Sequence, residues 1–144
     1  MKALLMVLGC GLLISVVLAQ PDTLWTRVYG GLEFDRSLGA LPLQDGGFFV
    51  TGYTESFGAG FRDMWLLRLD ENGDTLWTRT YGGGEEDVGN SIIPAQDGNY
   101  WLSGRTMSYG VGARDWLLIK IDENGDSLWS RTFGSAGADW GGRI

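Results

Sequence analysis

Short apolar stretches separated by Gly-containing turns run along most of the chain. The segments Asn90 to Ala95 (NSIIPA) and Tyr100 to Thr106 (YWLSGRT) flank an Asp-Gly turn, and Arg114 to Asp122 (RDWLLIKID) and Asp126 to Phe133 (DSLWSRTF) flank an Asn-Gly turn. Such dipeptides between apolar runs predict tight hairpins, with Gly125 at positive φ. No stretch shows a sustained 3.6-residue apolar period with caps, so no helix is expected in the mature chain.

The chain repeats itself with a period of about 52 residues. Asp22 to Gly73 aligns without a gap with Asp74 to Gly125, and residues 126–144 begin a third, truncated copy. Four strands per repeat is the content of a propeller blade. The predicted fold is therefore all-β, with tandem four-stranded antiparallel blades. About two and a third repeats cannot close a ring alone, so a longer parent chain or assembly with copies or partners is expected.

The best retained positions indicate how blades pack. Trp25, Trp77 and Trp129 occupy one position of the repeat, a fixed distance beyond the turns at Gly73 and Gly125. A blade cannot bury its faces alone, so a large ring repeated once per blade is suited to docking neighbouring blades. These five residues are the predicted structural positions.

The stretch LDENGDTLWTRTYGG, which ends at Gly83, resembles the Asp, Gly, Trp blade signature of quinoprotein-type propellers. It is more similar to the roughly 50-residue repeats of secreted bacterial and archaeal β-propeller proteins. The resemblance covers essentially all of Asp22 to Ile144. It implies a propeller architecture with a docking tryptophan, and it implies no particular activity.

The N-terminus predicts export. Lys2 is followed by an apolar run to Ala19, which reads as a Sec-type signal peptide (residues 1–19) cleaved near Ala19. An uncleaved membrane anchor is a less favoured alternative, because the run is at the short limit for a membrane span. A second alternative is a lipoprotein signal ending at Cys10, although little sequence precedes this residue. The mature chain, residues 20–144, is expected to be periplasmic, cell-surface or secreted.

Composition excludes several kinds of chemistry. The chain has 24 glycines and three prolines, which suits short strands joined by tight turns. Cys10 is the single cysteine and there is no histidine, so the mature chain offers no disulfide, no Cys/His zinc site and no imidazole base. A net charge of −7 makes nucleic acid and anionic membranes poor partners.

The acidic turns raise a calcium hypothesis. Oxygen-bearing side chains alternate along the two DENGD segments, but the Gly and Glu positions of an EF-hand loop are not matched. A structural turn is the preferred interpretation. The weak metal candidates are Asp70, Asn72, Asp74, Asp122, Asn124 and Asp126.

Gly-rich loops carry further acidic residues at equivalent places, namely Glu33, Asp35, Glu85 and Asp87. The favoured role for an Asp just before a strand is to accept hydrogen bonds from loop amides, while a cation or sugar contact is an alternative. Arg62-Asp63 and Arg114-Asp115 open the third strand of each repeat and are interpreted as an ion pair or cap at its start.

These observations favour a binding or structural module of a secreted or cell-surface protein, and the chain is expected to be a fragment of a longer one. The alternative is part of an exported carbohydrate-active or quinoprotein-like enzyme. No catalytic residue and no cofactor is predicted, apart from the weak calcium possibility. Expected partners are further propeller repeats or other copies of the chain, and protein or carbohydrate ligands.

Overall fold

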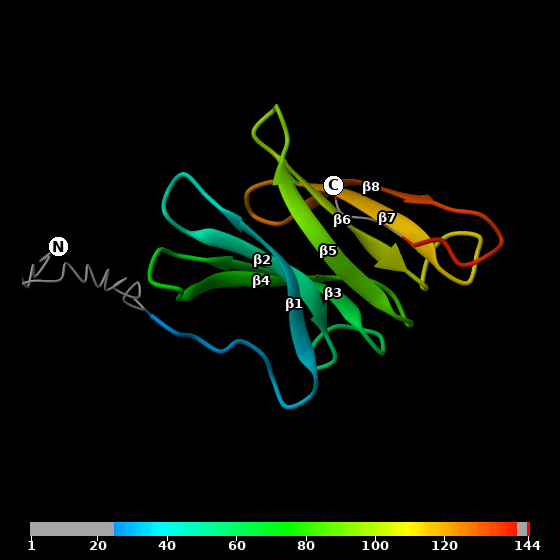
Figure 1. Cartoon of the computed structure of the whole chain (residues 1–144), viewed down its shortest axis with the longest axis horizontal. Helices are drawn as coiled ribbons and strands as arrows, with labels where there is room; N and C mark the ends of the chain where they lie inside the picture. Colours follow the sequence, from blue (N-terminus) through cyan, green and yellow to red (C-terminus); the bar gives the residue numbers. More distant parts are fainter. Residues whose placement is uncertain (1–24, 141–143) are drawn as a thin grey trace, which may run out of the picture.

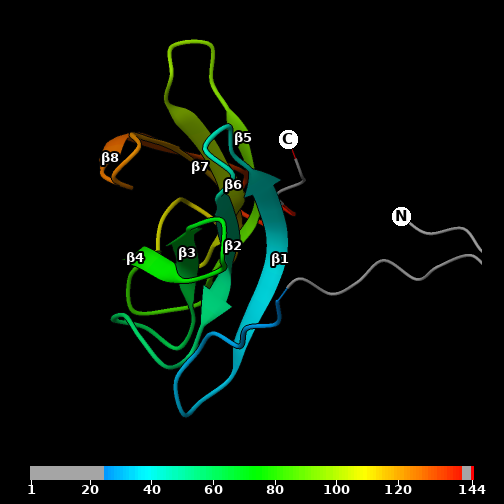
Figure 2. The same ribbon diagram turned by 90° about the vertical axis from the view of Figure 1, so that its left-hand side faces the viewer.

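The computed structural model describes residues 25–140 and residue 144. The predicted signal peptide, its cleavage point and Cys10 lie outside the described residues. Figures 1 and 2 show two twisted sheets side by side, with residues 25–34 running past the first. In the part of the chain that the structure describes, all regular structure is β-strand.

Each sheet is a four-stranded antiparallel meander in chain order. The first contains β1 (Asp35–Pro42), β2 (Phe48–Thr54), β3 (Asp63–Leu69) and β4 (Thr75–Tyr81), and the second contains β5 (Asp87–Pro94), β6 (Tyr100–Thr106), β7 (Asp115–Ile121) and β8 (Ser127–Phe133). The predicted fold class is thus confirmed, since the two sheets are tandem blades and neither closes on itself.

The hairpins form where the turn residues predict them. Gly73 and Gly125 adopt φ values of 77° and 78°, which residues with a Cβ rarely tolerate. Their amides donate hydrogen bonds to the carbonyls of Asp70 and Asp122, at 3.1 and 3.2 Å, which closes each turn. The β3–β4 and β7–β8 ladders follow directly from these turns.

The two sheets pack face to face through β5, which lies against β1, β2 and β3. Apolar side chains alternate along β3, so Met64 and Leu66 point toward the second sheet and Trp65, Leu67 and Leu69 point to the opposite face. Both faces of β3 are buried, which explains its nearly continuous apolar sequence. The core between the sheets contains Phe49, Met64, Leu66, Ile92, Leu102, Leu117, Ile119 and Ile121.

Sheets and sequence repeats are out of phase by one strand. β4 lies in the second sequence repeat, which begins at Asp74, yet it pairs with β3 of the first. Likewise β8 lies in the truncated third repeat and completes the second sheet. Each sheet therefore takes its first three strands from one sequence repeat and its fourth strand from the next.

Candidate functional site

One end of the two sheets carries longer loops, which we call the rim. It consists of residues 30–34, 55–62, 82–86, 107–114 and 134–140, which lie where odd-numbered strands begin and even-numbered strands end. Two isolated parallel bridges join rim segments: Arg62 with Glu86, between the first sheet and the start of the second, and Arg114 with Ala138, within the rim of the second sheet. Loops on a sheet scaffold are the usual place for binding residues.

Two aspartates hold the rim loops in the same way. Asp35 Oδ2 accepts hydrogen bonds from the Gly31 amide at 2.8 Å and the Ser56 hydroxyl at 2.8 Å. Asp87 Oδ2 accepts from the Gly83 amide at 2.9 Å and the Ser108 hydroxyl at 2.6 Å. This geometry is the loop-anchoring role that the repeat pattern favours.

The carboxyl group of Asp35 is kept ionised by these contacts. Burial acts to raise its pKa, but hydrogen bonds from Thr54, the Gly31 amide and Ser56 outweigh burial and lower the pKa below its usual value. Glu33 and Glu85 contribute their backbone amides instead, which donate to Ser56 at 3.0 Å and Ser108 at 3.1 Å.

Asp63 and Asp115 also anchor loops, and both side chains are buried. Asp63 Oδ2 accepts from the Gly60 amide at 2.9 Å, and Asp115 Oδ2 accepts from the Val111 and Gly112 amides at 2.8 and 3.1 Å. These residues act as caps at the start of the third strand in each sheet.

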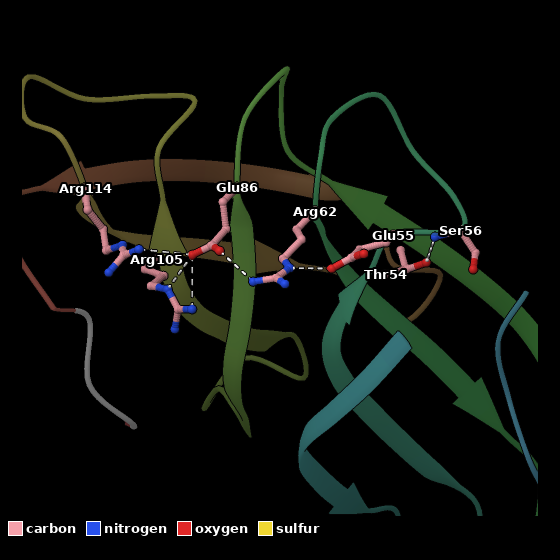
Figure 3. Close-up of polar contacts among 7 residues, drawn as sticks. All are labelled: Thr54, Glu55, Ser56, Arg62, Glu86, Arg105 and Arg114. Atoms are coloured by element: carbon pink, nitrogen blue, oxygen red, sulfur yellow. Dashed lines mark hydrogen bonds and ion pairs between the residues drawn. The ribbon is translucent and has the colours of Figure 1, made fainter. Parts of the chain in front are cut away.

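The arginines beside these aspartates have other partners (Figure 3). Arg62 donates to Glu55 at 2.7 Å and to Glu86 Oε2 at 2.9 Å. Arg105 and Arg114 both donate to Glu86 Oε1, at 3.1 and 3.2 Å. Three guanidinium groups, two from rim loops and one from β6, therefore converge on one carboxylate, whose side chain is 13% exposed.

The network shifts the pKa values of Glu86 and Arg62. Burial acts to raise the pKa of Glu86, but hydrogen bonds and charge from Arg105, followed by Arg62 and Arg114, lower it overall. The hydrogen bond from Arg62 to Glu55 raises the pKa of this guanidinium despite partial burial. We infer that the network joins the two sheets at the rim.

The repeat pattern missed Glu86 because this position is not repeated. Phe34 and Ala138 stand at the equivalent places of the neighbouring repeats. Two features of the sequence could have indicated the site. Arg62 and Arg114 occupy equivalent repeat positions and each needs a counter-ion, and Glu86 is an acidic residue at a position that the other repeats do not retain.

Aromatic side chains lie next to two arginines of the network. The Arg62 guanidinium lies 4.8 Å from the ring centre of Tyr53 and 5.0 Å from that of Phe61, and the Arg114 guanidinium lies 4.5 Å from that of Trp140. These are cation–π distances. The exposed large apolar side chains of the rim are Leu32, Phe34, Phe57, Phe61, Met107, Tyr109, Val111 and Trp140.

The acidic turns lie at the opposite end of the sheets. Asp70 Oδ1 accepts from the amides of Asn72 and Asp74, at 2.9 and 2.8 Å. Asp122 Oδ1 accepts in the same way from the amides of Asn124 and Asp126 at 2.9 Å. Among residues 25–140 and 144, no group of three or more acidic residues is placed to hold a metal ion.

The predicted docking tryptophans lie at equivalent places with different neighbours. Trp25 contacts Gly73, and Trp77 contacts Gly125 of the second sheet. Trp129 lies on the outer face of the second sheet, 41% exposed, with its ring centre 5.6 Å from that of Trp101.

A groove of about 780 Å³ separates the β1–β2 and β5–β6 hairpin turns, at the end opposite the rim. Tyr100 packs edge to face on Phe49 at its floor, and Arg68 pairs with Asp45 beside them. The groove therefore lies apart from the rim.

Comparison with protein-family models and with curated proteins gave no match. No helix among the described residues is long and apolar enough to cross a membrane.

Proposed function

We propose that this chain is a propeller-type repeat module of a secreted or cell-surface protein, and that it binds an extracellular ligand through its rim. The observation that carries the proposal is the concentration of exposed aromatic side chains, next to half-buried arginines, on loops whose backbones are anchored. Phe61 and Tyr109 are exposed, while Asp63 and Asp87 hold the loops beside them. Exposed aromatic groups on a fixed scaffold bind with little loss of conformational entropy.

The side-chain chemistry favours a ligand with flat apolar faces and hydrogen-bonding groups. Aromatic rings contact apolar faces, and the N–H groups of Arg62 and Arg114 offer donors next to them. Carbohydrate has this combination, so polysaccharides are the first ligands to test, with protein surfaces as the alternative.

Affinity electrophoresis of the mature chain through gels that contain single polysaccharides tests the proposal. Retardation in at least one gel is expected, and replacement of Phe61 and Tyr109 by serine should abolish it. The control is Leu76→Ser, because this exposed side chain lies on β4 away from the rim. Retardation that survives the rim substitutions, or chemical turnover of the polysaccharide, would contradict a rim-binding module.

A further inference from the structure

Gly82, the first residue after β4, lies between two carboxylates that open strands of different sheets. Asp63 begins β3 of the first sheet, and Asp87 begins β5 of the second. A Cβ at Gly82 would lie 2.6 Å from Asp63 Oδ1 and 2.6 Å from Asp87 Oδ2, so these two oxygens are separated by no more than twice that distance. Both residues are buried, with exposed fractions of 2% and 0%. Two buried carboxylates therefore meet at one point of the junction between the sheets.

The same arrangement returns about 52 residues later, at Gly134 directly after β8. A Cβ at Gly134 would overlap Asp115 Oδ1 and would lie 3.0 Å from Asp139 Oδ2. Asp115 is fully buried, and its Oδ1 is enclosed without a hydrogen-bond partner among the described residues. A buried, unpartnered carboxylate oxygen thus faces a second carboxylate, and the pairing of carboxylates across a glycine is a repeated feature of the rim.

No basic side chain compensates the charge of these four carboxylates. In the part of the chain that the structure describes, every ion pair of Lys or Arg involves another acidic residue. Loop amides bond to Oδ2 of Asp63 and of Asp115, and this leaves Oδ1 of each facing the second carboxylate. Buried carboxylates are stable when they are paired or bind a metal ion, and two of them close together repel each other. The arrangement therefore suits a bound cation.

We propose that Ca²⁺ binds between Asp63 and Asp87 and between Asp115 and Asp139, and thereby joins each blade to the next at the rim. Ca²⁺ takes about six to eight oxygen ligands at about 2.3 to 2.6 Å, so one ion spans two oxygens that are up to about 5 Å apart. The carboxylate oxygens on the two sides of Gly82 lie within this reach. Mg²⁺ fits less well, because it demands near-ideal octahedral geometry at shorter distances.

Neutral oxygens lie close to the pair at Gly82. The Ser108 hydroxyl is 2.6 Å from Asp87 Oδ2, and the Gly82 carbonyl accepts a hydrogen bond from the Tyr109 hydroxyl at 2.7 Å. With two carboxylates per ion, neutral oxygens and water complete the coordination. Binding is therefore expected to be weak, with a Kd of about 0.1 to 1 mM, as in other extracellular calcium modules. The site does not depend on the ligand proposed for the rim.

Equilibrium dialysis of the mature chain against radioactive Ca²⁺, from about 0.05 to about 5 mM, tests the proposal. We expect two ions per chain, one ion after Asp87→Asn, and none after Asp87→Asn is combined with Asp139→Asn. Asparagine removes the charge but keeps a carbonyl oxygen that accepts hydrogen bonds from the loop amides. Absence of saturable binding to the wild type, or unchanged binding to the double variant, would overturn the proposal.

The matched control combines Asp74→Asn with Asp126→Asn in the DENGD turns. Both side chains are exposed, at 67% and 70%, so the substitutions leave the core intact. This variant should still bind two ions, and loss of binding would place calcium at the turns instead of the rim. If the rim variants do not fold, this comparison decides, because the control keeps the wild-type rim.

Thermal melting separates calcium binding from loop anchoring alone. In EDTA, Asp87→Asn should melt no lower than the wild type, because the substitution relieves repulsion with Asp63. In about 5 mM CaCl₂ the wild type should melt about 5 °C higher than in EDTA, and Asp87→Asn should gain about half of this rise. The same concentration of MgCl₂ should give a smaller rise. If Asp87→Asn melts well below the wild type in EDTA and both chains gain equally from calcium, the aspartates anchor loops only and the proposal is wrong.

Discussion

Trp77 of the first sheet lies directly over Gly125 in the β7–β8 turn of the second, so close that a Cβ at Gly125 would be 2.7 Å from the ring. The glycine therefore serves two purposes. Its φ of 78° closes the hairpin, and its missing side chain leaves room for the tryptophan of the neighbouring sheet.

Gly125→Ala should destabilise the protein by more than the backbone strain in the turn accounts for. The left-handed backbone costs a residue with a Cβ about 1 to 2 kcal/mol, and displacement of Trp77 adds lost packing, so we expect the free energy of unfolding to fall by about 3 kcal/mol. Urea denaturation of the two proteins measures the difference.

The matched control is Gly98→Ala. Gly98 has a similar φ of 84°, but a Cβ there would meet nothing within 4 Å. Gly98→Ala should therefore lower the free energy of unfolding only by the cost of the left-handed backbone, about 1 kcal/mol. Equal losses of unfolding free energy in the two variants would show that the packing of Trp77 does not depend on the missing side chain at Gly125.

Glu86→Gln should weaken the junction between the sheets. The substitution leaves Arg62, Arg105 and Arg114 close together without their shared anion, and we expect a loss of about 2 kcal/mol in the free energy of unfolding. Glu85→Gln changes an exposed carboxylate on the same loop and should alter the free energy by less than about 0.5 kcal/mol. A similar effect of both changes would contradict the network's role.

The contribution of Glu86 should also depend on pH. Its pKa is lowered from 4.5 in the folded protein, so the unfolded chain binds the proton more readily. The stabilisation is then fully present above about pH 5 and is lost as pH falls through the lowered folded pKa. The stability gap between the wild type and Glu86→Gln should narrow between about pH 5 and pH 3, measured by urea titrations at each pH. A constant gap would contradict the lowered pKa.

Much of the fold was predictable because short-range signals determine it. The segment Tyr100 to Thr106 is β6 with the predicted bounds, and the Asn-Gly turns close the predicted hairpins. β5 begins at Asp87, three residues before the apolar stretch that predicts it, because Asp87, Val88 and Gly89 pair with β6 although Asp and Gly are uncommon in strands.

The site was less predictable because it depends on contacts between repeats. The sequence identifies Arg62 and Arg114 as repeated, yet the residue that joins them stands at an unrepeated position, 24 residues from Arg62. An ion pair between each arginine and the adjacent aspartate was one predicted alternative. The structure instead gives the aspartates loop amides and gives the arginines Glu86, because neighbouring strand residues point to opposite faces.

Export stays a prediction that can be tested directly. If residues 1–19 form a cleaved signal peptide, the protein recovered from the extracytoplasmic fraction should begin at Gln20 or within a residue or two of it. Intact-mass spectrometry of the expressed protein distinguishes this from a retained N-terminus. A protein that keeps Met1 in the cytoplasmic fraction would contradict export.

The last prediction concerns self-association of the mature chain. The outer face of the second sheet presents Trp101, Trp116, Leu118, Trp129 and Phe133, which are the repeat equivalents of Phe49, Met64, Leu66, Trp77 and Tyr81. Phe49, Met64, Leu66, Trp77 and Tyr81 pack between the two sheets. The outer face of the second sheet therefore has the side chains of an interface between blades, but no further blade covers it among the described residues.

Burial of such a face stabilises by about 25 cal/mol per Å², so several hundred Å² correspond to several kcal/mol, enough to bring two copies together at micromolar concentration. Trp129 and Phe133 are 41% and 38% exposed and lie at the edge of this face. We therefore expect the mature chain to sediment as dimers or larger species, and Trp129→Gln with Phe133→Gln to shift it toward monomer. Leu76→Gln, an exposed position on β4, is the control. A compact wild-type monomer that melts cooperatively at about 50 µM would show that this face is stable in water without a partner.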